Sequence, residues 1–138
     1  MSALAAADLP AGLTHFLAFD FGLKRIGVAV GNRLVRCASP QATIRAEGDA
    51  RWTLVTARVA EWQPDALVVG VPFHPDGAEH ENTQRARRFA RQLRGRFKLP
   101  VYEVDERYST TEALAAGAPD ADAASAAIIL EQFLRSLP

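Results

Sequence analysis

The sequence FLAFDFGLKRIGVAV, residues 16–30, indicates the fold class more clearly than any other part of the chain. Its beginning, residues 16–21, is a short apolar run that predicts a buried strand, and Ile26–Val30 predicts a second strand. Between them Gly22–Arg25 predicts a turn, so the two strands should form a hairpin. A single charged side chain, Asp20, interrupts the first strand.

Beyond the hairpin, apolar periodicity predicts that helices and strands alternate. We expect a third strand within 34–44, interrupted near Pro40, and then a helix over Ala50–Trp62 with Leu54, Val55, Val59 and Trp62 on one face. The remaining elements are expected in this order: a strand over 66–70, a helix over 83–93, a strand over 100–104, a short helix capped by Ser109 and Glu112, and a last helix over 120–134. This order predicts an α/β fold, a mixed five-stranded sheet flanked by helices. Residues 1–14 are expected to be a flexible tail, and residues 15–138 a single domain.

Composition restricts the class of protein. The chain has 138 residues and a formal net charge of zero, which argues against a polycation but allows a local basic patch. No apolar run approaches the roughly 20 residues that cross a membrane. Met1–Leu13 lacks Lys and Arg, which argues against a secretory signal. The single cysteine, Cys37, fits a reducing cytoplasm, where we expect the protein, and should behave as a small apolar residue.

Acidic residues stand at the ends of three predicted elements. Asp20 ends the first strand, where a carboxylate is costly unless it is paired, solvated or bound to a metal, although it could simply cap the turn. Asp105 and Glu106 follow the fifth strand, and they could equally form a solvated loop with Arg107. Because adjacent residues point to opposite faces of a strand, only one of this pair should join Asp20.

The third acid lies in the first turn of the last helix. Asp122 could interact with the helix dipole, but Asp120 is the more natural cap. If the three element ends meet at one edge of the sheet, their carboxylates would suit Mg²⁺ or Mn²⁺. Two such ions stabilise the attacking and leaving oxygens of phosphodiester cleavage.

The helix that begins at Thr83 carries many arginines. No acidic residue interrupts Gln84–Lys98, and the basic residues there are Arg85, Arg87, Arg88, Arg91, Arg94, Arg96 and Lys98. Their spacing allows Arg87, Arg91, Arg94 and Lys98 to form one ridge that could contact phosphates without reading sequence. The alternative is a solubilising face. His74 lies in the loop after the fourth strand. We expect it to be an exposed histidine rather than a general base or a metal ligand.

Four blocks of the sequence together resemble the YqgF family, whose members are also described as pre-16S rRNA nucleases or RuvX-type homologues of Holliday junction resolvases. The blocks are residues 19–30, residues 69–72 with Asp76 and Gly77, residues 105–110, and residues 122–130. The resemblance runs in order from about Phe16 to Leu134 and implies an RNase H-like fold related to RuvC resolvases. It also implies a cytoplasmic bacterial protein that acts in maturation of the 16S rRNA 5′ end.

The resemblance implies roles for individual residues as well. Asp20, one acid of the Asp105–Glu106 pair and Asp122 would be the catalytic carboxylates, with Glu106 favoured within the pair. Lys24, Arg25 and Arg107 match basic positions that would contact phosphate or orient the acids. The chain departs from the family in the loop before the last helix, which is usually longer and contains Gly and Lys. Here only Gly117–Asp120 joins the helices, so a weaker hold on the substrate is expected.

Three other functions remain open from the sequence. The same carboxylates would serve a junction resolvase acting on branched DNA, which needs two sites and therefore a dimer. The segment Asp20–Gly22 with its hairpin also resembles the first phosphate loop of actin-like and sugar-kinase-like ATPases. A non-catalytic RNA-binding factor for ribosome assembly is the third alternative. The favoured partner is structured RNA, either pre-16S rRNA or the pre-ribosome, with the protein a monomer or a weak homodimer.

Overall fold

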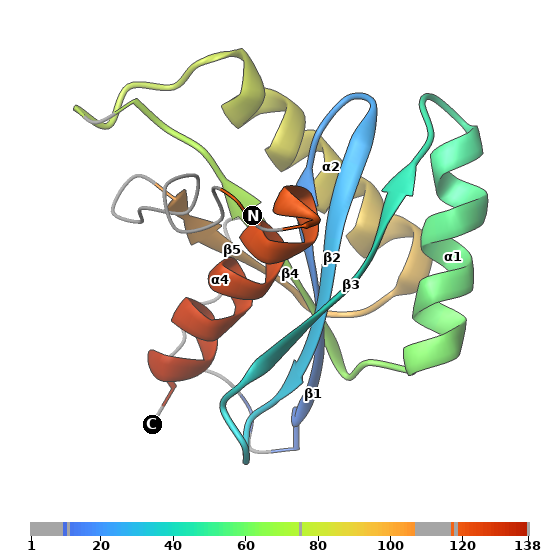
Figure 1. Ribbon diagram of the computed structural model, residues 1–138, viewed down its shortest axis with the longest axis vertical. Helices are drawn as coiled ribbons and strands as arrows, with labels where there is room; N and C mark the ends of the chain where they lie inside the picture. The colour runs from blue at the N-terminus through green and yellow to red at the C-terminus, as the bar shows by residue number, and fades with distance from the viewer. Residues whose placement is uncertain (1–9, 11, 75, 107–116, 118, 138) are drawn as a thin grey trace.

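The computed structural model describes Pro10, residues 12–74, residues 76–106, Gly117 and residues 119–137. Within these residues a five-stranded sheet in the order β3-β2-β1-β4-β5 is covered by helices on both faces (Figure 1). The elements are β1 (His15–Phe21), β2 (Arg25–Asn32), β3 (Ala38–Arg45), α1 (Ala50–Trp62), β4 (Ala66–Val71), α2 (Glu81–Phe97), β5 (Val101–Asp105) and α4 (Ala121–Arg135).

The sheet is mixed, as the sequence predicts. β1 pairs antiparallel with β2, and β2 pairs antiparallel with β3, so the first three strands form a meander. β4 lies parallel to β1 on its other side, and β5 lies parallel to β4. The carboxyl ends of β1, β4 and β5 therefore meet at one end of the sheet.

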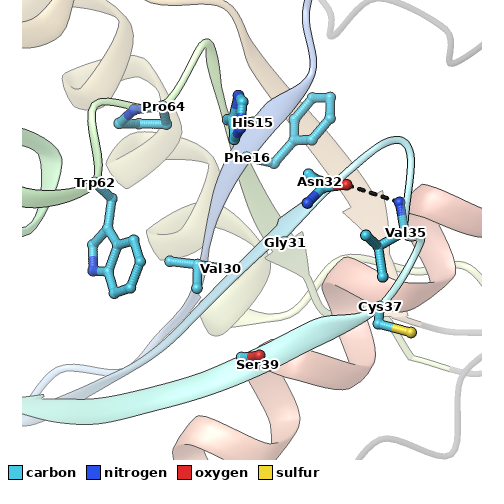
Figure 2. A pocket seen from close by; sticks show the side chains of 10 residues that line it. All are labelled: His15, Phe16, Val30, Gly31, Asn32, Val35, Cys37, Ser39, Trp62 and Pro64. Carbon is cyan, nitrogen blue, oxygen red and sulfur yellow. Dashed lines mark hydrogen bonds between the residues drawn. The ribbon is translucent and has the colours of Figure 1, made fainter.

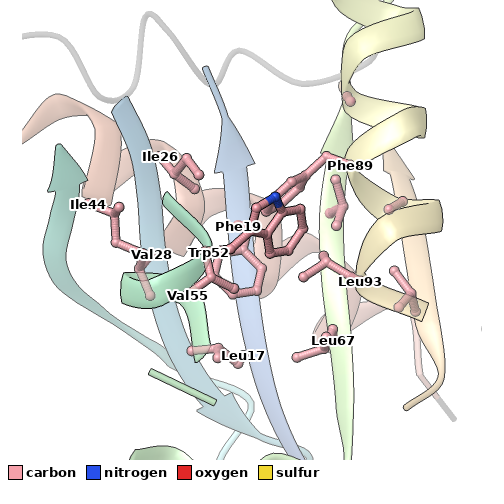
Figure 3. Packing of buried hydrophobic residues seen from close by; sticks show 14 of the residues in the cluster. Leu17, Phe19, Ile26, Val28, Ile44, Trp52, Val55, Leu67, Phe89 and Leu93 are labelled. Carbon is pink, nitrogen blue, oxygen red and sulfur yellow. The ribbon is translucent and has the colours of Figure 1, made fainter. Parts of the chain in front are cut away.

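The alternation of β1 divides the core into two layers. Leu17 and Phe19 pack with α1 and α2 on one face, where Phe19 meets the Phe89 ring edge-on with their centroids 5.7 Å apart (Figure 3). Phe16 and Ala18 pack with α4 on the other face. Asp20 continues this second set, so the strand period directs its side chain to the α4 face.

Two details of the elements differ from the predictions. β3 is not interrupted at Pro40, because β3 is an edge strand and Pro40 still pairs with Ala29. In α1 the buried face contains Trp52 and Val55, whereas Leu54 and Trp62 are 41% and 39% exposed. Val55 and Val59 face the core as predicted, but Trp52 completes the face in place of Leu54 and Trp62.

Other predictions have mixed outcomes. Cys37 is exposed, which does not fit its expected role as a small apolar residue. The short helix expected after Ser109 lies outside the described residues, as does most of the predicted tail, although Leu13 packs against the α4 side of the core. No helix in the described part of the chain has the length and apolar character to span a membrane.

Candidate carboxylate site

Asp20 lies opposite a glycine on β2. Asp20 and Gly27 are paired residues of the antiparallel hairpin, and a β-carbon on Gly27 would collide with the backbone carbonyl of Asp122. The first turn of α4 therefore rests directly on β2 beside Asp20. The missing side chain at position 27 makes this close approach possible.

A second glycine lies on the other side of Asp20. Gly70 on β4 comes one residue after Val69, the parallel partner of Phe19. A β-carbon on Gly70 would lie 3.0 Å from the carboxylate of Glu106 and 2.5 Å from Ile129 of α4. The Glu106 carboxylate thus lies over Gly70, on the sheet face that α4 covers.

The two adjacent acids at the end of β5 are divided between the faces of the sheet. Tyr102 and Val104 pack on the α4 side, whereas Val101 packs on the α2 side. The alternation of β5 directs Asp105 to the α2 side. Of the pair, the structure thus brings Glu106 to the face that Asp20 shares.

Asp122 lies in the first turn of α4, as expected, and the cap of the helix is a different residue. The Asp120 carboxylate accepts hydrogen bonds from the Ala123 N–H and the Thr43 hydroxyl, and the Thr43 bond is the main cause that lowers the pKa of Asp120. Asp122 instead pairs with Arg25, whose Nε lies 3.3 Å from its Oδ2. The side chain of Asp122 is 33% exposed and accessible to a ligand.

The donor chemistry of this face suits a hard cation, because Asp20, Glu106 and Asp122 offer only carboxylate oxygens. Within the described residues, however, no three His, Cys, Asp or Glu side chains lie close enough together to hold a metal ion. The three acids share one face and one end of the sheet, but their carboxylates are not gathered around a single point.

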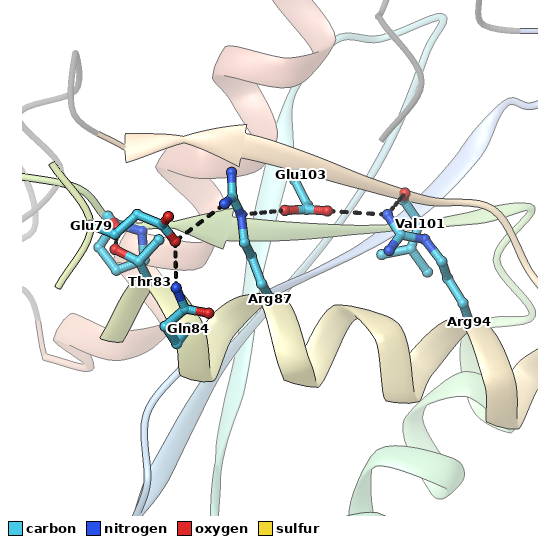
Figure 4. Close-up of polar contacts among 8 residues, drawn as sticks. Glu79, Thr83, Gln84, Arg87, Arg94, Val101 and Glu103 are labelled. Carbon is cyan, nitrogen blue, oxygen red and sulfur yellow. Dashed lines mark hydrogen bonds and ion pairs between the residues drawn. The ribbon is translucent and has the colours of Figure 1, made fainter. Parts of the chain in front are cut away.

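The predicted ridge of α2 is partly neutralised by a strand residue. Arg87 Nε and Arg94 Nη2 lie 3.4 Å and 3.2 Å from the two carboxylate oxygens of Glu103 on β5 (Figure 4). Arg87 also pairs with Glu79 at 3.3 Å. The sequence of the helix could not reveal these partners, because they come from outside it.

The remaining basic positions are more accessible. Arg85 pairs with Glu81 one turn earlier in α2, whereas Arg88 and Arg91 are exposed and make no ion pair with another described residue. Lys24 is exposed in the turn between β1 and β2. Arg107 lies outside the described residues.

The histidines of the loop before α2 are not near the acids in any described contact. His74 is exposed, as predicted, and its ring centroid lies 4.8 Å from that of His80. His80 caps α2, since its Nδ1 accepts the Asn82 N–H and the Thr83 hydroxyl oxygen accepts the His80 N–H. The sequence reasoning missed this cap because histidine is an uncommon N-cap residue.

A pocket of about 260 Å³ lies at the opposite end of β1 from Asp20 (Figure 2). Its walls include His15 and Phe16 at the start of β1, the end of β2, and Trp62 and Pro64 after α1. It contains none of the predicted site residues.

Comparison with known proteins identifies the family of the chain. A family model described as "RuvX: Holliday junction resolvase" matches residues 14–136. A protein of Polaromonas sp. (strain JS666 / ATCC BAA-500) is 72% identical over 138 residues, which cover 100% of both chains. A protein of Albidiferax ferrireducens is 75% identical over 127 residues, covering 92% of this chain and 81% of the relative. Both relatives carry the name "Putative pre-16S rRNA nuclease".

Among solved structures, RuvC of T. thermophilus in complex with a Holliday junction substrate superposes with a TM-score of 0.54 at 15% identity. The superposition covers 89% of this chain and 94% of RuvC. At this identity the likeness shows the fold alone, which is the RNase H-like fold that the resemblance implied. By the family model and these relatives, the chain belongs to the RuvX family, also called YqgF.

Proposed function

We propose that this protein is a metal-dependent endonuclease that processes the 5′ end of pre-16S rRNA in the cytoplasm. One observation carries the proposal: β1, the end of β5 and the first turn of α4 bring Asp20, Glu106 and Asp122 to the same face and the same end of the sheet. Relatives of 72% and 75% identity that are named for this activity support the substrate.

In this proposal Asp20, Glu106 and Asp122 hold Mg²⁺ or Mn²⁺. When bound, the metal would activate water and stabilise the oxygens of the cleaved phosphodiester. Asp20 lies between the other two acids. On one side its strand partner Gly27 packs against the backbone of Asp122, and on the other side Gly70 lies against the Glu106 carboxylate. These carboxylates would have to move closer together to complete a ligand set.

In the proposal Glu106, and not Asp105, is a metal ligand. Because the alternation of β5 directs the Asp105 side chain to the α2 face, we assign the ligand role to Glu106.

Lys24 and Arg25 at the turn beside Asp20 are proposed to contact substrate phosphates, together with Arg85, Arg88 and Arg91 of α2. Arg87 has two acidic partners and would contribute less.

The test is cleavage by the purified full chain. A labelled RNA that spans the mature 5′ end of 16S rRNA and a labelled four-way DNA junction are incubated with Mg²⁺, with Mn²⁺ or with EDTA. We expect metal-dependent cleavage of the RNA, loss of cleavage in Asp20→Asn, and retention in Glu61→Gln, which removes an exposed carboxylate on α1.

Each other result contradicts part of the proposal. Cleavage of the junction but not of the RNA would replace the substrate with branched DNA. Binding of RNA with no cleavage under either metal would make the protein an RNA-binding factor. Equal rates for Asp20→Asn and the unmodified chain would place the reaction elsewhere.

A further inference from the structure

A second pocket lies at the same end of the sheet as Asp20, but on the opposite face. Its volume is about 330 Å³, and it lies between the end of β1, the beginning of α1 and the first half of α2. Its lining includes Phe21, Asp49, Arg51, Arg85, Arg88 and Gln92. Phe21 follows Asp20 directly, so the pocket begins one residue from the proposed metal ligand.

The chemistry of this pocket is that of an anion site. Three guanidinium groups line it, from Arg51, Arg85 and Arg88, against the single carboxylate of Asp49. Asp49 forms no ion pair with another described residue and gives α1 no side-chain cap, so it does not neutralise these arginines directly. Arg88 likewise has no ion pair within the described part of the chain. Arg85 forms an ion pair with the exposed Glu81, in which Arg85 Nη2 lies 3.5 Å from Glu81 Oε2.

Arg51 is held in place without using all of its donors. Its guanidinium carbon lies 5.0 Å from the centroid of the Phe21 ring, and its Nη2 donates to the Leu23 carbonyl at 3.0 Å. The Nε is buried and has no hydrogen-bond partner. A planar guanidinium that is fixed by stacking and one hydrogen bond is well suited to phosphate oxygens, because little side-chain entropy remains to be lost.

The pocket also shows which side of α2 has arginines that are not paired with Glu103. Arg87 and Arg94 face Glu103, whereas Arg85, Arg88 and Gln92 recur at helical spacing on the side that faces α1. On the same side, Arg96 lies over the Trp52 ring at 4.1 Å. On α2, the arginines that line the pocket beside Phe21 are therefore those on the side facing α1, and not the predicted ridge that contains Arg87 and Arg94.

We propose that Arg51, Arg85 and Arg88 form a phosphate-binding pocket for the RNA strand next to the phosphate that is cleaved. The inference rests on the proposed function for the position of the scissile phosphate at Asp20. The strand would pass from the carboxylate face around the β1–β2 turn, and its backbone would enter the pocket beside Phe21. Arg51 is the residue that this inference adds to the nucleic-acid interface.

The experiment measures RNA affinity by fluorescence anisotropy at several KCl concentrations. The probe is a fluorescein-labelled single-stranded RNA with the 16S 5′ precursor sequence, and every protein carries Asp20→Asn so that cleavage does not interfere. Arg88→Gln and Arg51→Lys should each weaken binding several-fold, and Arg88→Gln should reduce the slope of log affinity against log salt by about 0.7, the value for one lost contact to a single strand.

Two charge-matched controls separate the pocket from net charge. Arg135→Gln removes an exposed arginine at the far end of α4 and should leave affinity unchanged. Asp49→Asn should raise affinity, because it removes the carboxylate of the pocket, whereas Glu61→Gln makes the same change of charge elsewhere on α1 and should not. Thermal unfolding of each variant verifies that it is folded.

The outcomes distinguish this inference from the proposed function. Cleavage by the chain with natural Asp20, combined with unchanged RNA affinity in Arg88→Gln and Arg51→Lys, would overturn the pocket and leave the nuclease intact. Equal losses in Arg88→Gln and Arg135→Gln would also overturn it, since net charge would then explain both. Pocket-dependent binding without any cleavage would preserve the pocket and refute the nuclease.

Discussion

Asp105 and Glu106 are adjacent in sequence and chemically alike, but the structure gives them different surroundings. The β5 alternation directs Asp105 to the α2 face, and the Glu106 carboxylate lies near Gly70 on the α4 face. The sequence could predict that only one of them joins Asp20. Choosing between them required knowing which face of β5 packs against α4, which the structure shows through Tyr102 and Val104.

The first prediction compares these two acids. Glu106→Gln should lower the rate of RNA cleavage by at least about 100-fold, because even the outer-shell partners of metal ligands contribute about 10–100-fold. Asp105→Asn should retain a rate close to that of the unmodified chain. Single-turnover cleavage in Mg²⁺ measures both. If Asp105→Asn is the more damaging change, the assignment of the ligand to Glu106 is wrong.

Glu103 shows that a residue outside a helix can neutralise basic side chains on that helix. Its carboxylate is 17% exposed and lies between Arg87 and Arg94, so it holds two arginines that the helix sequence presents as unpaired. A pattern of basic residues predicts which side chains share a face of α2. It does not predict which of them the neighbouring strand neutralises.

The second prediction follows from this arrangement. Glu103→Gln should lower the free energy of unfolding by about 1–3 kcal/mol, because two half-buried guanidinium groups lose their charged partner. Glu81→Gln is the matched control: Glu81 is 86% exposed and pairs with Arg85 on the surface of α2, so its loss should cost about 0–0.5 kcal/mol. Urea unfolding followed by circular dichroism measures both, and equal effects would contradict the prediction.

At the scale of elements, the contact between α4 and β2 places Asp122. Periodicity along the chain predicts both elements correctly, and Asp120 is the cap that the sequence favoured. The direct packing of α4 on Gly27 was not predictable, because a glycine in a strand sequence does not reveal what approaches it. The backbone carbonyl of Asp122 occupies the space of the absent side chain.

The third prediction tests this contact. Gly27→Ala should force the first turn of α4 away from β2, lowering the free energy of unfolding by about 1–3 kcal/mol and reducing cleavage, since Asp122 moves with the turn. Gly95→Ala is the control, because a β-carbon there meets nothing within 4 Å and the residue lies inside α2. It should instead raise the free energy of unfolding by about 0.5–1 kcal/mol. A Gly27→Ala protein as stable and active as the unmodified chain would refute the close packing.

For the whole molecule, a single carboxylate joins the start of the sheet to the connection between α1 and β4. Asp65 Oδ2 accepts the backbone N–H groups of Thr14 and His15, each at 2.9 Å, and the Thr14 hydroxyl at 3.1 Å. The bond from the His15 N–H is the main cause, and the bonds from Thr14 the next, that lower the pKa of Asp65 from 3.8 to about 2. The element order is local and could be predicted, but this long-range connection could not.

The fourth prediction is a pH dependence with a defined sign. Because the pKa of Asp65 is lower in the folded than in the unfolded state, its contribution to stability is complete above about pH 4 and is lost as pH falls towards 2. Asp65→Asn should cost about 1 kcal/mol at pH 7, a modest value because the side chain is 37% exposed, and the difference from the unmodified chain should shrink over this window. Urea unfolding at a series of pH values measures it. A difference independent of pH would contradict the assignment.

If Asp122 binds the metal and Arg25 a substrate phosphate, as proposed, the ion pair between these two residues would make the affinities for metal and for RNA depend on each other. A divalent cation that binds Asp122 must displace the guanidinium, and a phosphate that binds Arg25 releases the carboxylate. Each ligand therefore removes the internal competitor of the other, and thermodynamic reciprocity requires both affinities to rise by the same factor. A nuclease built in this way would hold its metal weakly while it is idle and tightly once a strand has arrived.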